Sequence, residues 1–469
     1  MPDCPILLTH RIQIVFMLTV GLYGKRFFGA KIKNSLQMKK TLLGVLAFAA
    51  ISVAACKKNK TEIPDETITY PAMAEASDPA LLMTTAAGVK VYNGGYGSAV
   101  AADPNDPTVF YLMTDRGPNV AGTTVPGSII LGKSDFTPAI GKFRLKDGKL
   151  VLEQVINLKN AAGINLNGLP NPIGAGNTGE LPYDLNGNAL TTSEDGLDSE
   201  GLVRASDGSF WVSDEYGPHI VHFDANGRTI ERINPFGSGT GGRKIPLVFA
   251  RRRANRGMEG LTITPDGKTL VGLMQSPMYN PSKTAVANSL VLRILTFDIA
   301  TGTTKQYAYL MDNITLTGCS EILALNATTF LTIERDGLYG GAPTNPATFK
   351  KIFKIDISGA TDISDAANAA SGKLYGGKTV EELNDMTGLT GAGITPVTKT
   401  LAIDLLKDLP TVYPHDKAEG IALLPGNMLA VSNDDDFGVV DNGASGFMAK
   451  ILASTGSVDH NRIYFVKLK

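Results

Sequence analysis

A short unit that opens with glutamate and closes with acidic residues recurs along the chain. Its clearest copy covers residues 200–215, where Glu200-Gly201 leads through an apolar run, an Asp-Gly turn and a second apolar run to Asp214-Glu215. An Asp-Gly turn between two β-type runs predicts a hairpin. Further copies open at Glu259, Glu321 and Glu419, and a fainter one opens at Ser98.

The two ends of a hairpin lie side by side, opposite the turn. The residue that opens each copy is therefore expected near the acids that close it. If the hairpins are arranged radially, their acidic ends would form one ring of carboxylates, and this ring is the candidate site.

The repeat returns about every 60 residues, and a second pair of β-type runs follows each copy. Four strands per repeat are the signature of propeller blades. We predict an all-β fold, a β-propeller with five clear four-stranded blades. Two of the steps between copies are longer, from residue 98 to 200 and from 321 to 419. They contain Gly/Asn/Pro-rich insertions at about 160–195 and 361–400, or each hides a degenerate blade, so six or seven blades are also allowed. The strand Val89–Tyr92 is expected to close the ring by joining the last blade. A β-sandwich is the alternative, but it does not explain the repeat.

The first 55 residues resemble a targeting segment. A basic start at Met38-Lys39-Lys40 precedes the apolar run 41–55, which is too short to span a bilayer comfortably. The sequence Val53-Ala54-Ala55-Cys56 is similar to a bacterial lipobox, which implies a lipoprotein acylated at Cys56. Met38 is the expected translation start, and an ordinary signal peptide with an incidental cysteine is the alternative.

This interpretation gives a signal segment at 1–55, a lipidated tether at 56–80 and a propeller domain at 81–469. We expect a monomer in the cell envelope, on the periplasmic side or at the outer-membrane surface, which touches the membrane only through its lipid. The net charge of −1 gives no indication of nucleic-acid binding. After processing, Cys319 would be the one free thiol, so no internal disulfide is expected.

Several motifs then point to one family. They are Asp115-Arg116-Gly117-Pro118-Asn119, residues 198–202, residues 214–217, residues 255–261, residues 419–421 and residues 433–438. In order and spacing they resemble the family called "esterase-like activity of phytase", over nearly the whole mature chain. The resemblance implies hydrolysis of a small-molecule phosphoric ester.

A ring of carboxylates would repel itself unless a cation compensated it. Oxygen ligands in a flexible arrangement suit Ca²⁺, and bound calcium could hold a phosphate and lower the pKa of an attacking water. The candidate metal ligands are Glu200, Glu215, Glu259, Glu321, Glu334, Glu419, Asp434 and Asp435.

Other residues of the same motifs could serve the reaction. Arg116, Arg256 and Arg335 could bind phosphate oxygens through two hydrogen bonds each. His219 and His415 lie near predicted strand ends, where either could donate a proton to the leaving group. The candidate catalytic residues are these two histidines with Glu200, Glu215 and Glu259.

Three alternatives are open. Each leading glutamate could pair with an arginine or accept hydrogen bonds from backbone N–H groups of the next blade, which would be a structural role. The propeller could bind a ligand or partner without catalysis. It could also be a lactonase-like ester hydrolase.

Overall fold

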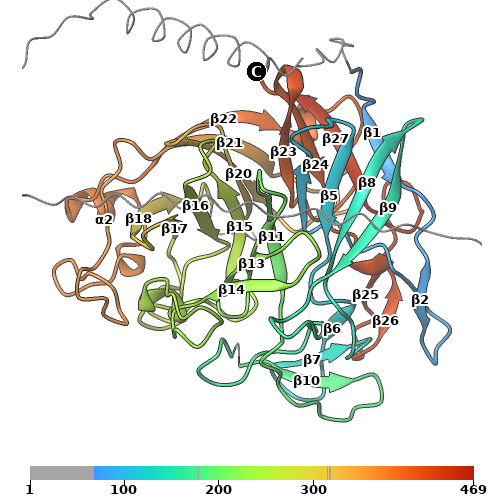
Figure 1. Cartoon of the computed structure of the whole chain (residues 1–469), viewed down its shortest axis with the longest axis horizontal. Helices are drawn as coiled ribbons and strands as arrows, with labels where there is room; N and C mark the ends of the chain where they lie inside the picture. The colour runs from blue at the N-terminus through green and yellow to red at the C-terminus, as the bar shows by residue number, and fades with distance from the viewer. Residues whose placement is uncertain (1–67, 178, 314, 316–317) are drawn as a thin grey trace, which may run out of the picture. The chain divides into compact units, whose positions relative to one another are not determined.

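The computed structural model describes residues 68–177, 179–313, 315 and 318–469 (Figure 1). The chain divides into two compact units, residues 1–68 and 69–469, and the second is described below. The predicted signal segment, the start at Met38 and the acylation of Cys56 lie outside the described residues.

Five groups of four antiparallel strands make up most of this unit, and we number them as blades 1 to 5. Three are separate sheets, and blades 1 and 5 are the two halves of one eight-stranded sheet. Blade 1 contains β4 (Ala99–Ala102), β5 (Val109–Met113), β8 (Ala139–Lys146) and β9 (Lys149–Asn157); blade 2 contains β11 (Ser199–Arg204), β12 (Phe210–Asp214), β13 (Ile220–Phe223) and β14 (Thr229–Ile233). Blade 3 contains β15 (Met258–Ile263), β16 (Thr269–Met274), β17 (Val291–Asp298) and β18 (Thr304–Leu310). Blade 4 contains β19 (Gly318–Ala324), β20 (Thr329–Arg335), β21 (Lys350–Asp356) and β22 (Thr398–Asp404); blade 5 contains β23 (Ile421–Leu424), β24 (Met428–Ser432), β27 (Arg462–Lys467) and β1 (Met73–Ala76).

The first strand of each blade contacts the first strands of the blades on either side. These contacts run β4 to β11 to β15 to β19 to β23 and back to β4, so they form a closed ring. The described residues therefore form a five-bladed propeller, as the repeat predicted. The long steps in the sequence are insertions rather than further blades.

The ring is closed by a different strand from the one predicted. Strand β1 pairs antiparallel with β27 and parallel with β9, which joins blades 5 and 1 into one eight-stranded sheet. The predicted closing segment Val89–Tyr92 was wrong, because β3 (Lys90–Tyr92) pairs instead with β2 (Leu81–Thr84). Since β1 belongs to blade 5, the propeller begins before the predicted boundary at residue 81.

The remaining strands and helices lie outside the five blades. Strands β6 (Asn119–Ala121), β7 (Ser128–Leu131) and β10 (Leu181–Asp184) form a three-stranded sheet, and β25 (Val439–Asp441) pairs with β26 (Phe447–Ala449). The helices are short: α2 (Met386–Gly391), α3 (Leu405–Asp408) and the 3₁₀ turns η1 (Leu247–Arg251), η2 (Glu381–Leu383), η3 (Pro425–Asn427) and η4 (Asp436–Gly438). Within the described part of the chain, no helix combines the length and apolar character that crossing a bilayer requires.

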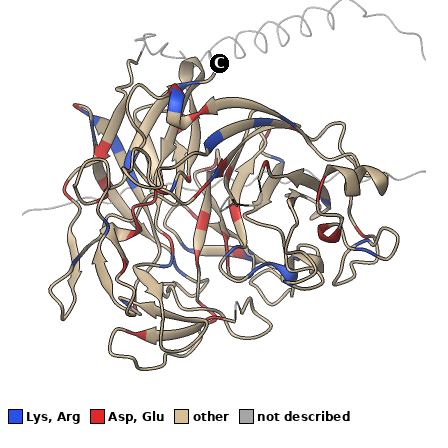
Figure 2. Ribbon diagram, turned by 180° about the vertical axis from the view of Figure 1, so that it is seen from behind, with Lys and Arg blue, Asp and Glu red and all other residues tan. Residues whose placement is uncertain are grey.

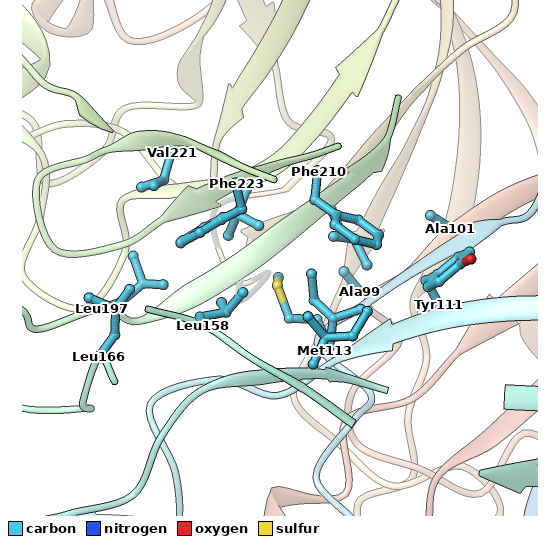
Figure 3. Close-up of a cluster of buried hydrophobic side chains, with 14 of the residues drawn as sticks. Ala99, Ala101, Tyr111, Met113, Leu158, Leu166, Leu197, Phe210, Val221 and Phe223 are labelled. Atoms are coloured by element: carbon cyan, nitrogen blue, oxygen red, sulfur yellow. The ribbon is translucent and has the colours of Figure 1, made fainter. Parts of the chain in front are cut away.

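Apolar side chains fill the spaces between adjacent blades. Figure 3 shows the cluster between blades 1 and 2, where Met113 and Tyr111 of β5 lie near Phe210 and Phe223 of blade 2. The rings of Tyr111 and Phe210 meet edge to face, with their centroids 5.3 Å apart. Burying one such side chain contributes about 1.5–3 kcal/mol. These contacts hold the first strands in place and so fix the residues at the rim of the axis.

Candidate metal centre

The glycine of the Glu-Gly repeat lies where two first strands approach most closely. A Cβ on Gly201, Gly260 or Gly420 would come within 2.5, 2.6 and 2.5 Å of a backbone nitrogen in the next blade. Only glycine fits such a contact. The glycine therefore lets the blades close around the axis, and it places the preceding glutamate at the rim.

Strand pairing shows which rim residues are equivalent. Beside Glu259 the pairing of β15 with β16 slips by one residue, and a bulge of this kind turns a side chain in a new direction. In blade 4 the sequence repeat aligns Glu321 with Glu259, but the slip lies one residue earlier, at Ser320, between Cys319 and Glu321. The equivalent rim positions are Ser98, Glu200, Glu259, Ser320 and Glu419.

Glu321 was predicted as a metal ligand, and the structure corrects this. Its position in the strand pairing is equivalent to that of Gly260, one residue after the rim position. Because successive side chains of a strand point to opposite faces, the Glu321 side chain lies on the face opposite to that of a rim residue. Its Oε1 accepts hydrogen bonds from the backbone nitrogens of Leu261, at 3.1 Å, and Ile322, at 2.9 Å. Glu321 thus has the structural role considered above, and it lines a separate cavity of about 480 Å³ at the hairpin-turn end of the first strands.

The second strands contribute a second set of equivalent rim residues: Asp115, Glu215, Gln275, Arg335 and Asp434. Glu334 precedes this position by one residue, so its side chain points away from the axis. It accepts a hydrogen bond from Tyr309 and forms an ion pair with Lys399 at 2.6 Å. The prediction of Glu334 as a metal ligand is therefore also corrected.

A cavity of about 290 Å³ lies between the two sets, and we call it the acidic cavity. Figure 2 shows acidic and basic segments close together on the strands in the middle of the domain. Seven predicted residues line the acidic cavity: Glu200, Glu215, Glu259, Glu419, Arg116, Arg256 and Arg335. The structure adds Asp115, Asp198, Gln275, Asp416, Lys417 and Asp436.

The remaining predicted ligands, Asp434 and Asp435, do not line the acidic cavity. Asp434 forms an ion pair with Lys417, with Oδ2 and Nζ 2.5 Å apart. Asp435 accepts a hydrogen bond from the backbone nitrogen of Phe437 at 3.0 Å. Both side chains support the blade 5 loop beside the cavity.

The structure does not bring either predicted histidine to the acidic cavity. His219 Nδ1 lies 2.8 Å from Asp214, and Nε2 lies 3.0 Å from the carbonyl oxygen of Ala175. His415 is hydrogen-bonded to Asp459 at 2.7 Å and to the Tyr464 hydroxyl at 2.9 Å. Burial lowers the pKa of both imidazoles. The hypothesis that either histidine donates a proton at the rim is therefore corrected, since both rings are buried and hydrogen-bonded to residues that do not line the acidic cavity.

Carboxyl groups crowd one side of the acidic cavity. Asp198, Glu200 and Glu215 each place an oxygen within 4.8 Å of the other two. Burial, followed by repulsion from neighbouring carboxylates, raises the pKa of Glu200 and Glu215 well above the usual range and that of Glu259 to about 7. These groups must bind protons or a cation.

Four oxygen atoms around the acidic cavity lack a hydrogen-bond partner among the described residues. They are Glu215 Oε1, Glu259 Oε2, Glu419 Oε2 and Gln275 Oε1, and all are buried. A buried acceptor without a partner costs about 1–3 kcal/mol, more if it is charged. This set of hard oxygen donors fits a cation such as Ca²⁺.

The predicted arginines lie on the rim, and carboxylates orient two of them. Arg116 Nη1 lies 3.1 Å from Glu180 and 3.2 Å from Asp198. Arg335 donates to Glu419 at 2.6 Å and to Ser320 at 2.7 Å. Arg256 is half-buried, and burial lowers its pKa. The acidic cavity therefore combines oxygen donors for a cation with cationic side chains for an anion.

Two of the residues that the prediction missed carry a simple sequence signal. Asp198 and Lys417 each precede a rim glutamate by two residues, and alternate residues of an extended chain lie on one face. Reading two positions back from Glu200 and Glu419 would have identified both. Gln275 has no such signal, because it is identified only by its position at the end of β16.

Comparison with known proteins shows the family of the chain. Residues 92–437, well over half of the chain, match the family model "Phytase-like: Esterase-like activity of phytase". The chain belongs to this family. A relative of this phytase-like chain, an uncharacterized secreted protein of Arthroderma benhamiae, is 29% identical over 378 residues, which are 65% of this chain and 70% of the relative.

Solved structures give only distant similarity. Aldose sugar dehydrogenase of Streptomyces coelicolor is 10% identical with a TM-score of 0.34, over 86% of this chain and 100% of the other. Hydrazine synthase of Kuenenia stuttgartiensis is 10% identical with a TM-score of 0.29, over 82% and 89%. These values carry no argument about the activity of the phytase-like chain.

Proposed function

We propose that this phytase-like propeller hydrolyses phosphoric esters of small molecules in the acidic cavity, with Ca²⁺ as its cofactor. One observation carries the proposal: Glu215, Glu259 and Glu419 line the cavity, and each has a buried carboxylate oxygen without a hydrogen-bond partner among the described residues. Rim arginines stand beside them. Oxygen donors for a divalent cation next to guanidinium groups form a suitable site for a phosphoryl group.

The fit to Ca²⁺ rests on the donors. Glu200, Glu215, Glu259 and Glu419 would supply carboxylate oxygens, and Gln275 would supply an amide oxygen. Calcium takes six to eight oxygen ligands in flexible geometry, so water and substrate could complete the set. When bound, the ion would neutralise the carboxylates, polarise a phosphoryl oxygen and lower the pKa of a water.

The chain's own residues would position the ester and supply a proton. Arg116 and Arg335 are held by carboxylates, so their guanidinium groups keep fixed positions for phosphate oxygens. Burial, with the nearby charge of Asp434, raises the pKa of Asp115 well above its usual range. Protonated Asp115, which lines the acidic cavity, is the donor we assign to the leaving-group oxygen. Water would attack phosphorus as the ester P–O bond breaks, the leaving-group oxygen would take the proton of Asp115, and the proton lost by the attacking water would restore protonated Asp115.

Hydrolysis of p-nitrophenyl phosphate and of bis(p-nitrophenyl) phosphate by the full chain tests the proposal. We expect turnover with Ca²⁺, loss with chelator, and a fall of about 100-fold or more in Glu215→Gln. Glu321→Gln is the matched control, because this glutamate faces the other cavity, and it should keep its activity. Turnover of p-nitrophenyl acetate alone would indicate a carboxylic-ester hydrolase instead, and Ca²⁺ binding without any turnover would indicate a binding propeller.

The location is also part of the proposal. The relative from Arthroderma benhamiae is a secreted protein, which agrees with a place outside the cytoplasm. We propose a monomer anchored in the cell envelope by a lipid on Cys56. Replacing Cys56 by serine should move the protein from the membrane fraction to the soluble fraction. A protein that stays soluble with Cys56 intact would contradict the anchor.

A further inference from the structure

The cavity at the hairpin-turn end of the first strands is larger than the acidic cavity, and we call it the turn-end cavity. Its volume is about 480 Å³, against about 290 Å³ for the acidic cavity. The first strands of all five blades line it. The two cavities share no lining residue, so the turn-end cavity is separate from the proposed active site.

The wall of the turn-end cavity is mainly aliphatic. Leu202, Ile263, Leu323 and Leu423 line it from four different blades, and Leu423 is 38% exposed. Prolines from three of the hairpin turns add to the wall: Pro104, Pro265 and Pro425. Hydrocarbon that covers such a wall removes apolar surface from water on both sides, which favours binding.

One cationic side chain lines this apolar cavity. Arg204 ends β11, and no other lysine or arginine of the described residues contributes to the wall. The Arg204 guanidinium carbon lies 4.8 Å from the centre of the Phe210 ring and 5.1 Å from that of the Tyr111 ring. These two rings, which also contact each other (Figure 3), hold the guanidinium in a fixed position.

The donors of Arg204 are largely unused. Its Nη1 donates to the carbonyl oxygen of Ser209 at 3.5 Å, which is a long hydrogen bond. Within the described part of the chain no carboxylate pairs with Arg204 and no second acceptor contacts it. A guanidinium has five N–H donors, and stacking on aromatic faces leaves the in-plane N–H groups for an oxygen acceptor.

The acidic residues of the same cavity do not serve as that acceptor. The Asp103 carboxylate accepts hydrogen bonds from two backbone nitrogens of its own turn, at 2.8 and 3.2 Å, and from the Tyr111 hydroxyl at 3.2 Å. Burial raises the pKa of Glu321 well above its usual range, so this carboxyl is neutral and does not repel an anion. The positive charge of Arg204 thus lacks a direct partner.

We propose that the turn-end cavity binds an aliphatic carboxylate, a small molecule with one anionic head and an unbranched hydrocarbon chain. Arg204 would bind the head through two parallel hydrogen bonds, and the aliphatic wall would cover the chain. This binding site is independent of Ca²⁺ and of the proposed hydrolysis, so each can fail without the other.

Calorimetry with sodium decanoate is the first test, with the full chain in EDTA and decanoate below the concentration at which it forms micelles. We expect the Kd to rise about tenfold in Arg204→Gln, which loses the charged hydrogen bonds. Leu423→Asp should raise it by about as much, because a negative charge at an exposed position of the wall repels the carboxylate.

Matched controls exist for both variants. Arg228 is an exposed arginine of blade 2 and Leu401 is a leucine of β22 that is 55% exposed, and neither lines the turn-end cavity. Arg228→Gln and Leu401→Asp should therefore leave the Kd unchanged. No binding of decanoate to the wild type, an unchanged Kd in Arg204→Gln, or an equal rise in the controls would overturn the proposal.

A series of ligands tests the chemical class. Decanoate should bind about tenfold more tightly than octanoate, because two more CH₂ groups are buried. Decan-1-ol lacks the charge, so it should bind the wild type about tenfold more weakly than decanoate and should bind Arg204→Gln as well as it binds the wild type. Equal affinities for octanoate and decanoate would exclude the aliphatic wall. Equal affinities for decanol and decanoate would exclude Arg204 as the anion-binding group.

Discussion

Two groups of carboxylates at the same end of the propeller differ in what balances their charge. The lysine-paired cluster of blade 5 comprises Asp416, Asp434, Asp436 and Asp459 with Lys417 and Lys450. Lys450 is fully buried and lies 2.8 Å from Asp416 and 2.6 Å from Asp436. The open cluster comprises Glu200, Glu215 and Glu259, and no lysine pairs with it among the described residues.

The difference shows in how each group binds its protons. In the lysine-paired cluster the two lysines hold the pKa of Asp436 below its ordinary value, although burial raises the pKa of Asp434 to about 7. In the open cluster burial raises the pKa of Glu259 to about 7 and no pKa is lowered. The chain thus supplies cations to one cluster and leaves the other to be compensated from outside. We infer that the first is structural and the second is a binding site, and four predictions test the distinction.

The largest effect is expected in the lysine-paired cluster. Lys450→Met would leave buried carboxylates without their cation, so the free energy of unfolding should fall by about 3–5 kcal/mol. Urea denaturation of the full chain measures this loss, and Ca²⁺ should not restore it. A fall of less than about 1 kcal/mol, or full rescue by Ca²⁺, would remove the difference between the clusters.

The open cluster should respond to calcium. At a Ca²⁺ concentration of 100 Kd, binding should stabilise the wild type by about 2.7 kcal/mol. Glu259→Gln removes a charged ligand, so most of this stabilisation should disappear. Urea denaturation with calcium and with chelator gives both values. Equal calcium stabilisation in the two proteins would exclude Glu259 as a ligand.

Without calcium, pH should act on the open cluster in an unusual direction. A carboxyl whose pKa is raised on folding binds more protons in the native state, so stability falls as pH rises between the two pKa values. For Glu259 this window runs from its ordinary 4.5 to about 7. The free energy of unfolding should drop by about 3 kcal/mol across it.

The pH test has its own control. In Glu259→Gln the drop between pH 4.5 and 7 should shrink, and Asp436 should show the opposite sign, losing stability only below its ordinary pKa of 3.8. Chemical denaturation in EDTA at a series of pH values measures both. Stability that rises steadily from pH 4.5 to 7 in the wild type would show that the open cluster is ionised without calcium.

The smallest effect is expected at Glu321, which the sequence places in the ring and the structure does not. The glutamine of Glu321→Gln can still accept the two backbone hydrogen bonds, so the free energy of unfolding should change by about 0.5 kcal/mol. The calcium stabilisation should be unchanged. Loss of that stabilisation would return Glu321 to the site.

The sequence was sufficient for the architecture and for part of the site. The recurring hairpins, each followed by a second pair of β-type runs, predicted five clear blades and left six or seven open. In three copies the glycine after the glutamate is required where adjacent blades touch. The same repeat placed Glu200, Glu259 and Glu419 at the rim. At these three positions the sequence repeat and the strand pairing place the glutamate at the same point of the blade.

The other site predictions failed because they depend on strand register and on contacts between residues distant in the sequence. A bulge one residue earlier in blade 4 puts Ser320 at the rim in place of Glu321, and a repeat that contains both residues does not reveal this shift. His415 looked available, but its partner Asp459 is distant in the sequence.

Proton release on calcium binding tests the central claim most directly, that the open cluster binds protons until a cation replaces them. Ca²⁺ is added to the unbuffered full chain at pH 6 and the released acid is titrated, with Glu259→Gln and Glu321→Gln in parallel. We predict net proton release from the wild type and from Glu321→Gln, and less from Glu259→Gln. Calcium binding without proton release, or no binding at all, would contradict the account.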